Sequence, residues 1–277
     1  MTTQTSKWQC RISPTLGDGF AGTPNKVWGT KDYKDLETPT VFFGCYGLPD
    51  LMVVRQHKGR KAILWAGTDV TYLINGYWLD DKGEFRLDPF VTGRFLNKTC
   101  ENWCENDLER HELLGVGIDA KVCPSYLGDV KKIKPCYKPG KKAYISVSGD
   151  DFKAYGWDKL EQIAKHNPDM ELHLYGRKGA WYHAGPPDKF GIYPKLPKNI
   201  IDHGRVPQEQ MNEEIKDMQI GIRLNEHDGF SEIIAKAVLM EQYVLSAIDY
   251  PFLSLGRKKA RQWLLKNVNK YPWNSNT

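Results

Sequence analysis

The chain has 277 residues, a formal net charge of +5, and 40% hydrophobic and 12% aromatic residues. This length suits one large domain or two small ones and allows a stable core without disulfide or metal support. The composition excludes an intrinsically disordered chain, and the mild basic charge suits anionic ligands such as nucleotide phosphates without requiring nucleic acid.

The first half predicts a compact α/β domain in which short strands alternate with helices. We expect strands at Gln9–Ser13, Thr40–Phe43, Lys61–Trp65 and Ala120–Pro124, and helices at Leu48–His57 and Asn102–Leu114. Gly115 and Gly117 follow the second helix, as glycines commonly do at a helix C-terminus.

A lysine-rich segment then marks the boundary between two domains. It also contains Pro135, Pro139 and Gly140, and a Lys/Pro/Gly run is typical of a solvated linker, although a basic lip at an interdomain cleft is the alternative. Its lysines are Lys131, Lys132, Lys134, Lys138, Lys141 and Lys142. We therefore predict an N-terminal Rossmann-like acceptor domain at residues 1–135, a donor domain at 136–255, and a C-terminal helix and tail at 256–277 that packs back on the N-terminal domain.

The second half predicts a Rossmann-like domain more clearly, because strands and helices alternate at the lengths of βαβ units. Such units form a parallel sheet with helices on both faces. The expected strands are Ala143–Val147, Glu171–Tyr175, a short one following Asn199–Asp202, Met218–Leu224 and Tyr243–Ala247. The expected helices are Trp157–His166, Gln208–Lys216 and Ser231–Met240.

Targeting signals and metal-binding motifs are absent from the sequence. No apolar run approaches the ~18 residues of a membrane span, and the N-terminal MTTQTSKW lacks the apolar core of a signal peptide. Cys100 and Cys104 are one helical turn apart, without a second pair at metal-ligand spacing. We expect a cytoplasmic protein with reduced thiols and no metal site.

The turn after Leu224 has the composition of a ligand-binding segment. Gly229 allows the backbone to approach a ligand, and Ser231 is a good N-cap for the following helix. Because helix N-termini at the carboxyl ends of strands attract phosphates, we expect a diphosphate to bind the amides around Phe230–Ile233. Asp228 would accept a hydrogen bond from a sugar hydroxyl. Alternatively, Asp228 is only a turn residue, and Glu232 only an acid favoured by the helix dipole.

The run HDGFSEIIAKAVLMEQYVLS resembles the donor-binding signature of retaining GT-B glycosyltransferases, in particular of family 4. That signature has an acidic residue, Gly-Phe-Gly, and a helix with a second Glu eight positions after the acid. In this register Asp228 takes the first acidic position, and Ser231 and Glu232 take positions whose backbone amides hold the phosphates. The likeness covers residues 143–252. It implies an α/β GT-B fold, with two Rossmann-like domains facing each other across a cleft.

Three positions depart from this pattern. Lys236 replaces the second Glu, which holds the donor ribose in the family, and Asp150 and Tyr155 replace an Arg and a Lys that grip the diphosphate. Lys236 is either part of an altered donor site or a solvated helix position. The candidate substitutes for the diphosphate contacts are Lys153, Arg177, Lys178, Arg223 and Lys236. We favour Arg223, because it ends a strand that points into the crevice.

The first half offers weaker candidates. Thr68 and Asp69 follow the strand at Lys61–Trp65, where the resemblance places a group that activates the acceptor, although local capping explains them equally well. The loop Gly17-Asp18-Gly19 resembles the glycine-rich loop that approaches the donor phosphate, but a hairpin turn is the alternative. In the second half, Gly149 follows the first donor-domain strand and completes the candidate donor contacts.

These features predict a hexosyl- or pentosyltransferase that moves a sugar from a nucleotide sugar to an acceptor hydroxyl. The donor would be a UDP- or GDP-sugar, used without cofactor or metal and with retention of configuration, and the acceptor a glycan, lipid or small molecule. The amides near Phe230, with Arg223 and Lys236, would neutralise the leaving diphosphate. Asp228 would orient the sugar, and Asp69 or Asp18 the acceptor hydroxyl.

Two alternatives stay open. The basic segment and the tail Arg257–Trp263 suit DNA, so the acceptor could be DNA that carries modified bases, as in phage enzymes of this fold. The changes at Asp150, Tyr155 and Lys236 instead suit a non-catalytic nucleotide-sugar or carbohydrate-binding protein on the same scaffold. The oligomeric state cannot be read from the sequence.

Overall fold

The computed structural model describes residues 8–17, 22–77, 86–147, 155–176 and 196–275. Its contacts divide the chain into two compact units. The first comprises Met1–Asp129, Asp228–Phe230 and Asn267–Thr277, and the second comprises Val130–His227 and Ser231–Lys266. The predicted domain boundaries at residues 135 and 255 stay a prediction.

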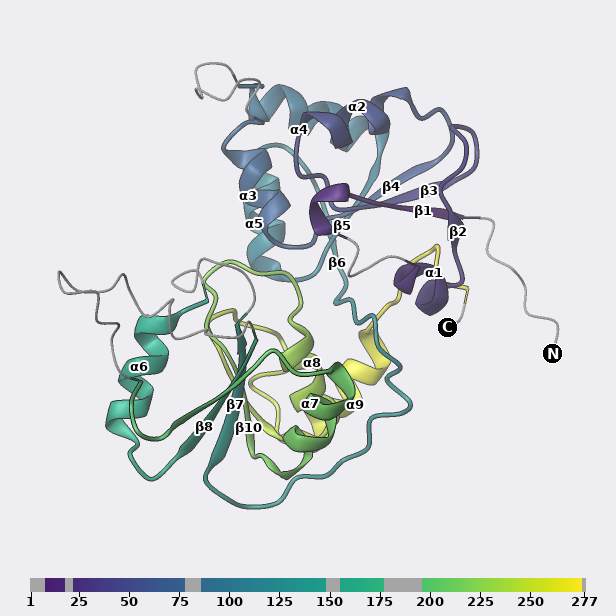
Figure 1. The fold of residues 1–277 in the computed structure, drawn as a ribbon. Helices are drawn as coiled ribbons and strands as arrows, with labels where there is room; N and C mark the ends of the chain where they lie inside the picture. Colours follow the sequence, from purple (N-terminus) through teal and green to yellow (C-terminus); the bar gives the residue numbers. More distant parts are fainter. Residues whose placement is uncertain (1–7, 18–21, 78–85, 148–154, 177–195, 276–277) are drawn as a thin grey trace, which may run out of the picture. The chain divides into compact units, whose positions relative to one another are not determined.

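The described residues of the first unit form a six-stranded parallel sheet in the order β2-β1-β3-β4-β5-β6 (Figure 1). The order changes direction between β1 and β3, which makes this pair the topological switch point of the sheet. The strands are β1 (Gln9–Ile12), β2 (Lys31–Asp32), β3 (Thr40–Phe43), β4 (Lys61–Leu64), β5 (Glu101–Cys104) and β6 (Lys121–Val122).

Both faces of this sheet are buried, because successive side chains of a strand point to opposite faces. Phe42 belongs to the core under the helices α2 to α5, while Val41 and Phe43 belong to the core that includes Trp28 of α1. The helical segments are η1 (Pro14–Leu16), α1 (Thr23–Trp28), α2 (Leu48–Gln56), α3 (Thr68–Ile74), α4 (Pro89–Thr99) and α5 (Asp107–Gly115).

The predicted helix at residues 102–114 is wrong over its first turn. Residues Glu101–Cys104 form β5, which pairs with β4 in parallel register, and α5 begins only at Asp107. The side chain of Asn106 caps α5 by accepting a hydrogen bond from Glu109 N at 3.0 Å. Strand pairing therefore overrides the local helical pattern, because a four-residue strand with two polar side chains has a weak signal of its own.

An aromatic cluster completes the second core of the first unit. Tyr271 and Trp273 stack at 4.6 Å between ring centroids, and Trp28 contacts Trp273 edge-on at 6.2 Å. Trp8 and Trp103 lie at 6.0 and 5.8 Å from Trp273. Residues close to the end of the chain thus form part of the core of the first sheet.

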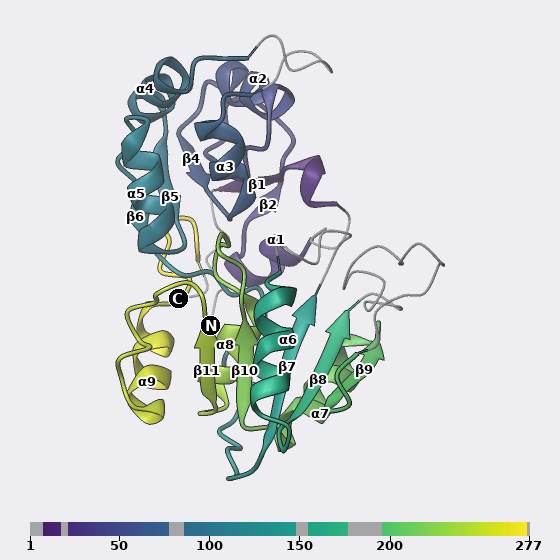
Figure 2. The same ribbon diagram turned by 90° about the vertical axis from the view of Figure 1, so that its left-hand side faces the viewer.

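The described residues of the second unit form a five-stranded parallel sheet in the order β11-β10-β7-β8-β9 (Figure 2). This is the Rossmann order, with its switch point between β7 and β10. The strands are β7 (Lys142–Val147), β8 (Glu171–Gly176), β9 (Ile200–Gly204), β10 (Ile220–Arg223) and β11 (Tyr243–Ser246). The predicted parallel sheet is confirmed.

Helices cover both faces of the second sheet. Trp157 and Leu160 of α6 pack on one face, and Met211 of α7 and Ile233 of α8 pack on the other. The helical segments are α6 (Trp157–His166), α7 (Gln208–Glu214), η4 (Ile215–Asp217), α8 (Glu232–Leu239) and α9 (Arg257–Asn267). Although α8 is buried on nearly all sides, no helix in the described ranges is long and apolar enough to cross a membrane.

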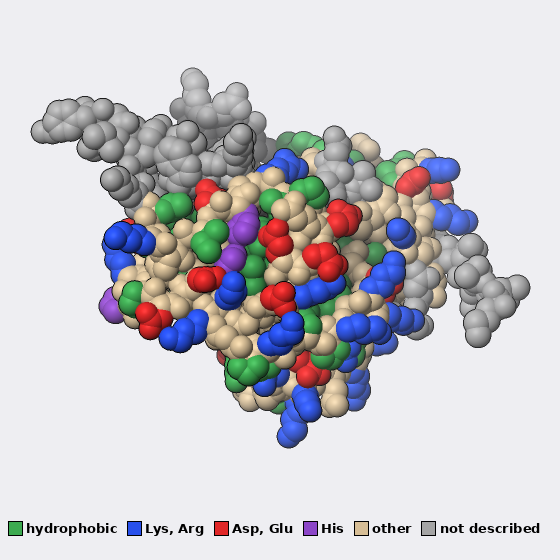
Figure 3. Space-filling model, turned by 60° about the horizontal axis from the view of Figure 1, so that its bottom comes forward, with side chains coloured by type: hydrophobic (Ala, Val, Ile, Leu, Met, Phe, Trp, Pro, Cys, Tyr) green, Lys and Arg blue, Asp and Glu red, His purple; other side chains and the backbone are tan. Residues whose placement is uncertain are grey.

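The lysine-rich segment contains lysines that form ion pairs. Lys138 lies 2.7 Å from Asp217, and Lys142 lies 2.9 Å from Glu171, both at exposed positions. On the face shown in Figure 3, basic and acidic side chains are interspersed. These pairs offset part of the basic charge that DNA binding would use, and the DNA acceptor stays a prediction.

We expect Trp273→Ala to lower the free energy of unfolding by about 3–5 kcal/mol, because it opens a cavity in the aromatic cluster. Denaturant unfolding followed by fluorescence measures this loss. Leu265→Ala is the control, since that side chain is 36% exposed, and it should cost less than about 1 kcal/mol. Equal losses in the two variants would contradict a structural role for the chain end.

Candidate functional site

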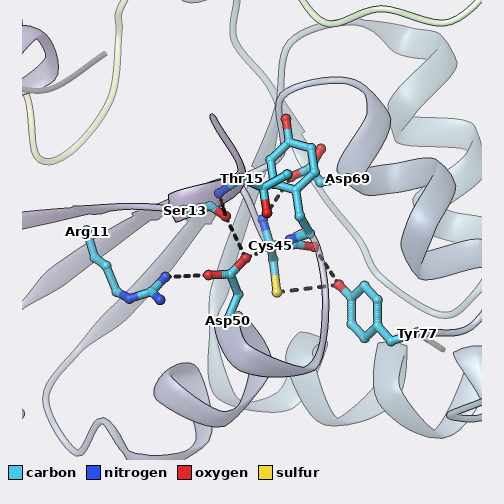
Figure 4. A network of polar contacts seen from close by, with 8 residues as sticks. Arg11, Ser13, Thr15, Cys45, Asp50, Asp69 and Tyr77 are labelled. Carbon is cyan, nitrogen blue, oxygen red and sulfur yellow. Dashed lines mark hydrogen bonds and ion pairs between the residues drawn. The ribbon is translucent and has the colours of Figure 1, made fainter. Parts of the chain in front are cut away.

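A polar network occupies the switch point of the first sheet (Figure 4). The buried Asp50 carboxylate accepts hydrogen bonds from Arg11 Nη1 and Ser13 Oγ, each at 2.7 Å, and from Tyr46 N at 2.9 Å. Since Arg11 and Ser13 lie at the carboxyl end of β1 and Tyr46 follows β3, Asp50 joins the two strand ends. It fixes the edge of the sheet at which ligands of open α/β folds bind.

Asp69 is fully buried at the start of α3, beside this network. Its carboxylate accepts backbone hydrogen bonds from Cys45 at 3.1 Å, Ala66 at 3.0 Å and Val70 at 3.1 Å. Burial raises the pKa of Asp69 to about 6, although the hydrogen bonds from backbone amides act in the opposite direction. These contacts match the interpretation of Asp69 as a local capping residue, and acceptor activation stays a prediction.

Two further carboxyl groups are buried where β5 leads into α5. Glu105 accepts hydrogen bonds from Ser125 Oγ and from Phe230 N, the latter at 2.6 Å, and Glu105 N donates to Glu109 Oε2 at 2.7 Å. Burial raises the pKa of Glu105 to about 8. Burial, followed by the charge of Glu105, raises the pKa of Glu109 well above its usual value. Within the described part of the chain, no group of three or more His, Cys, Asp or Glu is placed to hold a metal ion.

The Asp228-Gly229-Phe230 turn belongs to the same unit as these carboxyl groups. Asn106 Nδ2 donates to the carbonyl oxygen of Asp228 at 2.8 Å and to that of Gly229 at 3.3 Å. Phe230 N donates to Glu105, so this amide already has an acceptor inside the protein. The consecutive residues Glu105 and Asn106 thus hold both ends of the turn that the sequence singled out.

Two glycines allow this close approach. A Cβ atom on Gly229 would collide with the Glu105 carboxyl group and lie 3.1 Å from the carbonyl carbon of Ala66. Gly67 has φ of +106°, and a Cβ atom there would lie 3.0 Å from the backbone nitrogen of Gly229. A glycine is therefore required at position 229 because protein atoms pack directly against it. From the sequence we also expected a close approach at Gly229, but to a ligand.

In the second unit, Arg223 lies at the switch point of the Rossmann sheet. It ends β10, and its Nη1 donates to the carbonyl oxygen of Ser146 on the adjacent β7 at 3.1 Å. Its guanidinium carbon lies 4.9 Å from the ring centroid of Tyr155. Tyr155, which departs from the family pattern, thus orients the cation that we expected to replace the family's basic residues.

The start of α8 is partly as predicted. Ser231 is at the N-cap, although its hydroxyl bonds no first-turn amide among the described residues. The amides of Glu232–Ile234 lack acceptors within the helix. Lys236 is only 3% exposed and lies 2.8 Å from Glu232 Oε1. The interpretation of Lys236 as a solvated helix position is therefore wrong, because α8 is buried at nearly every position.

Sequence reasoning missed several residues near these sites. Glu105, Asn106 and Ser125 hold the turn or its neighbours, and the Asn106 cap was hidden by the helix predicted over it. Asn225, between β10 and the turn, is 7% exposed, and its Oδ1 accepts no hydrogen bond within the described chain. A buried amide oxygen without a donor is costly, so it marks a position where a ligand donor would be stabilised.

Several predicted site residues lie outside the described residues, and their roles stay predictions. They are Asp18, Gly19, Gly149, Lys153, Arg177 and Lys178. Gly17 is described: it is exposed, follows η1 and has φ of +70°.

Known structures share this fold. The chain matches a crystal structure of a TarM mutant from S. aureus in complex with Fondaparinux, alpha-GlcNAc-glycerol and UDP, with a TM-score of 0.52 and 14% identity. The match covers 85% of this chain and 53% of that one, so the chain spans about half the length of TarM. No protein-family model and no curated protein sequence matches the chain.

Two weaker matches were found. The pneumococcal O-GlcNAc transferase GtfA, in complex with UDP and GlcNAc, gives a TM-score of 0.47 at 11% identity, covering 84% of this chain and 50% of that one. The trehalose 6-phosphate synthase of Burkholderia multivorans gives 0.48 at 11% identity, covering 87% and 66%. Together with the two parallel sheets, the likeness to TarM shows that the chain has the GT-B fold.

We expect the free energy of unfolding to fall as the pH rises from about 5 to 8. In this window the folded protein retains a proton on Glu105 that the unfolded chain has lost, which costs about 1.4 kcal/mol per pH unit, and the raised pKa of Glu109 acts in the same direction. Glu105→Gln should flatten the decline and stabilise the protein at pH 8, as denaturant unfolding at several pH values would show.

The control is Glu209→Gln, which alters an exposed side chain of α7 and should retain the wild-type slope. If Glu105→Gln retained that slope too, the raised pKa of Glu105 would be disproved.

Proposed function

We propose that the chain is a glycosyltransferase that moves a sugar from a nucleotide-diphosphate donor to an acceptor hydroxyl. One observation carries this proposal. The Asp228-Gly229-Phe230 turn follows β10 of a Rossmann sheet and directly precedes α8, in the register of the family 4 donor signature. The GT-B fold supports the same function, since the signature and the fold agree at the level of individual elements.

In the proposed reaction, the bond between the anomeric carbon and the diphosphate oxygen breaks, and the acceptor oxygen bonds to that carbon. The acceptor proton leaves with the diphosphate. Arg223 and the first-turn amides of α8 act as fixed positive charge for the departing diphosphate. Asp228 accepts a hydrogen bond from a donor-sugar hydroxyl, and Asn225 Oδ1 offers a second acceptor.

A uridine nucleotide sugar is our first candidate donor, because the TarM structure was determined with UDP. Retention of configuration and independence from metal rest on the family 4 resemblance. We assign Asp69 a supporting role, because both of its oxygens accept backbone hydrogen bonds and its side chain is fully buried. The acceptor class, whether a glycan, a lipid or a small molecule, is best found by screening.

A non-catalytic nucleotide-sugar-binding protein is the second candidate. The Lys236–Glu232 pair favours it, because the cation at the family's ribose-binding position is already neutralised by a neighbouring acid. A donor-hydrolysis assay over several UDP- and GDP-sugars separates the two functions. A transferase releases free nucleotide, whereas a binding protein shows only a ligand-induced rise in melting temperature.

We expect Asp228→Asn to lower kcat by about 100-fold, because the neutral side chain binds the developing charge of the sugar more weakly. The melting temperature should stay within about 2 °C of wild type, since the turn is held by its backbone. Glu226→Ala is the control in the same segment, as Glu226 is 81% exposed. Wild-type turnover in Asp228→Asn would remove Asp228 from the mechanism.

We expect Arg223→Gln to raise the KM for the donor by about tenfold, as loss of one charge-assisted bond to a phosphate would. Arg223→Lys should recover only part of this affinity, because an ammonium group stacks on Tyr155 less well than a guanidinium. The measurement is donor-dependent kinetics of nucleotide release. An unchanged KM in both variants would exclude contact between Arg223 and the donor.

A further inference from the structure

We propose that Glu105 and Asn106 are positioning residues that fix the Asp228-Gly229-Phe230 turn, and with it the Asp228 carboxylate, for sugar transfer. This inference rests on the proposed function, because it concerns the turn that we assign to the donor. Neither residue belongs to the donor signature. Both act through the backbone of the turn, Glu105 on the amide of Phe230 and Asn106 on the carbonyl of Asp228.

Asn106 uses both ends of its side-chain amide. Its Oδ1 accepts from Glu109 N at 3.0 Å and so caps α5, while its Nδ2 donates to Asp228 O at 2.8 Å. The cap fixes the rotamer of the side chain, so the Nδ2 atom is held in place before it meets the turn. A change in the orientation of the Asn106 side chain would therefore displace the backbone of Asp228, the residue that carries the proposed catalytic carboxylate.

Glu105 leaves the turn little freedom to move. Its Oε2 lies 2.6 Å from Phe230 N, and its Oε1 is held by Ser125 Oγ. Gly229 packs so closely against the same carboxyl group that no side chain fits between them. The carboxyl group therefore sets the position of Phe230 N from one side, while Asn106 sets that of the Asp228 carbonyl from the other.

Burial of a carboxyl group at position 105 lowers the stability of the fold, which argues that Glu105 does more than support the turn structurally. An amide side chain would offer Phe230 N an acceptor of the same shape without the desolvation of a charge. Among the described residues, the negative charges of Asp228 and Asp69 add to the effect of burial and disfavour the ionised form of Glu105, and Glu109 interacts with it in the same sense. The other ionisable groups that interact with Glu105 have raised pKa values and are neutral here; they are Tyr46, Tyr271, Cys104 and Cys123.

The proton on Glu105 consequently controls the charge beside Asp228. Burial, opposed in part by the bonds from Ser125 and Phe230, brings the pKa of Glu105 to about 8. Below this pH the neutral carboxyl group supports the turn without repelling the Asp228 carboxylate. Above it, a second negative charge faces Asp228.

The contact can be tested without any activity measurement. Labelling glycine carbonyls with ¹³C and phenylalanine amides with ¹⁵N selects the Gly-Phe pairs, which are only Gly19-Phe20 and Gly229-Phe230. We expect the Phe230 amide signal of the wild type to titrate near pH 8 and that of Glu105→Gln to stay constant. Glu109→Gln, which changes a buried carboxyl group that does not bond the turn, should retain a titrating signal.

Kinetics then separate positioning from structural support. In the wild type, nucleotide release should fall about tenfold by pH 9, as expected when only the protonated form of a group with a pKa of about 8 is active. Glu105→Gln should match the wild type at pH 7 within about threefold and lose this alkaline decline. A merely structural residue would change the melting temperature and leave the shape of the pH profile intact.

Asn106→Ser tests the second contact. Serine retains an N-cap for α5 but is too short to reach the Asp228 carbonyl, so kcat should fall about tenfold at saturating donor and at a temperature well below the lowered melting temperature, with the alkaline decline of the pH profile retained. A Phe230 signal that does not titrate, or that titrates equally in Glu105→Gln, would overturn the inference while the proposed function stands. If the wild-type protein showed no turnover, the proposed function would be disproved. The titration of the Phe230 amide would then test only the contact with Glu105.

Discussion

The hydrogen bond from Phe230 N to the buried Glu105 carboxyl group constrains the rest of the candidate site. It holds the Asp228-Gly229-Phe230 turn within the first unit. The bond needs a glycine at position 229 and an α5 that starts at Asp107, so that Asn106 is free to cap and to bind. The residue types at positions 105, 106 and 229 are therefore all constrained by this one hydrogen bond.

The buried carboxyl groups lower the stability of the folded protein and lie where a ligand is expected to bind. Glu105, Glu109 and Asp69 all lie at the carboxyl edge of the first sheet, and burial raises the pKa of each. At Glu105 a glutamine would make the protein more stable at neutral pH, because the folded protein would no longer have to keep a proton there. Groups with strongly shifted pKa values tend to lie at functional sites, where stability is given up for chemistry or positioning. Their place at the ligand-binding edge of the sheet agrees with this interpretation.

The sequence predicted the second sheet well, because β7, β8 and β10 are apolar runs separated by helices with clear periodicity. It failed at β5, whose short segment with two polar side chains acquires its structure from the parallel neighbour β4, and it did not anticipate α3, at whose start Asp69 accepts backbone hydrogen bonds. The donor turn was recognisable from Asp228 to Ser231 as a local motif. Its partner Glu105 was not, since no pattern in the chain links residues 125 positions apart.

The charge at the start of α8 bears on the proposed donor site. A Glu at position 236 would present a carboxylate to the donor ribose, as in the family resemblance, whereas Lys236 is buried and paired with Glu232. The pair is neutral, so neither residue adds net charge for the diphosphate. What remains among the described residues is the first-turn amides of α8 and the Arg223 guanidinium, which stacks on Tyr155. One guanidinium charge and a set of directed backbone hydrogen bonds would then hold the diphosphate in the proposed site, and such donors select the geometry of the ligand as well as its charge.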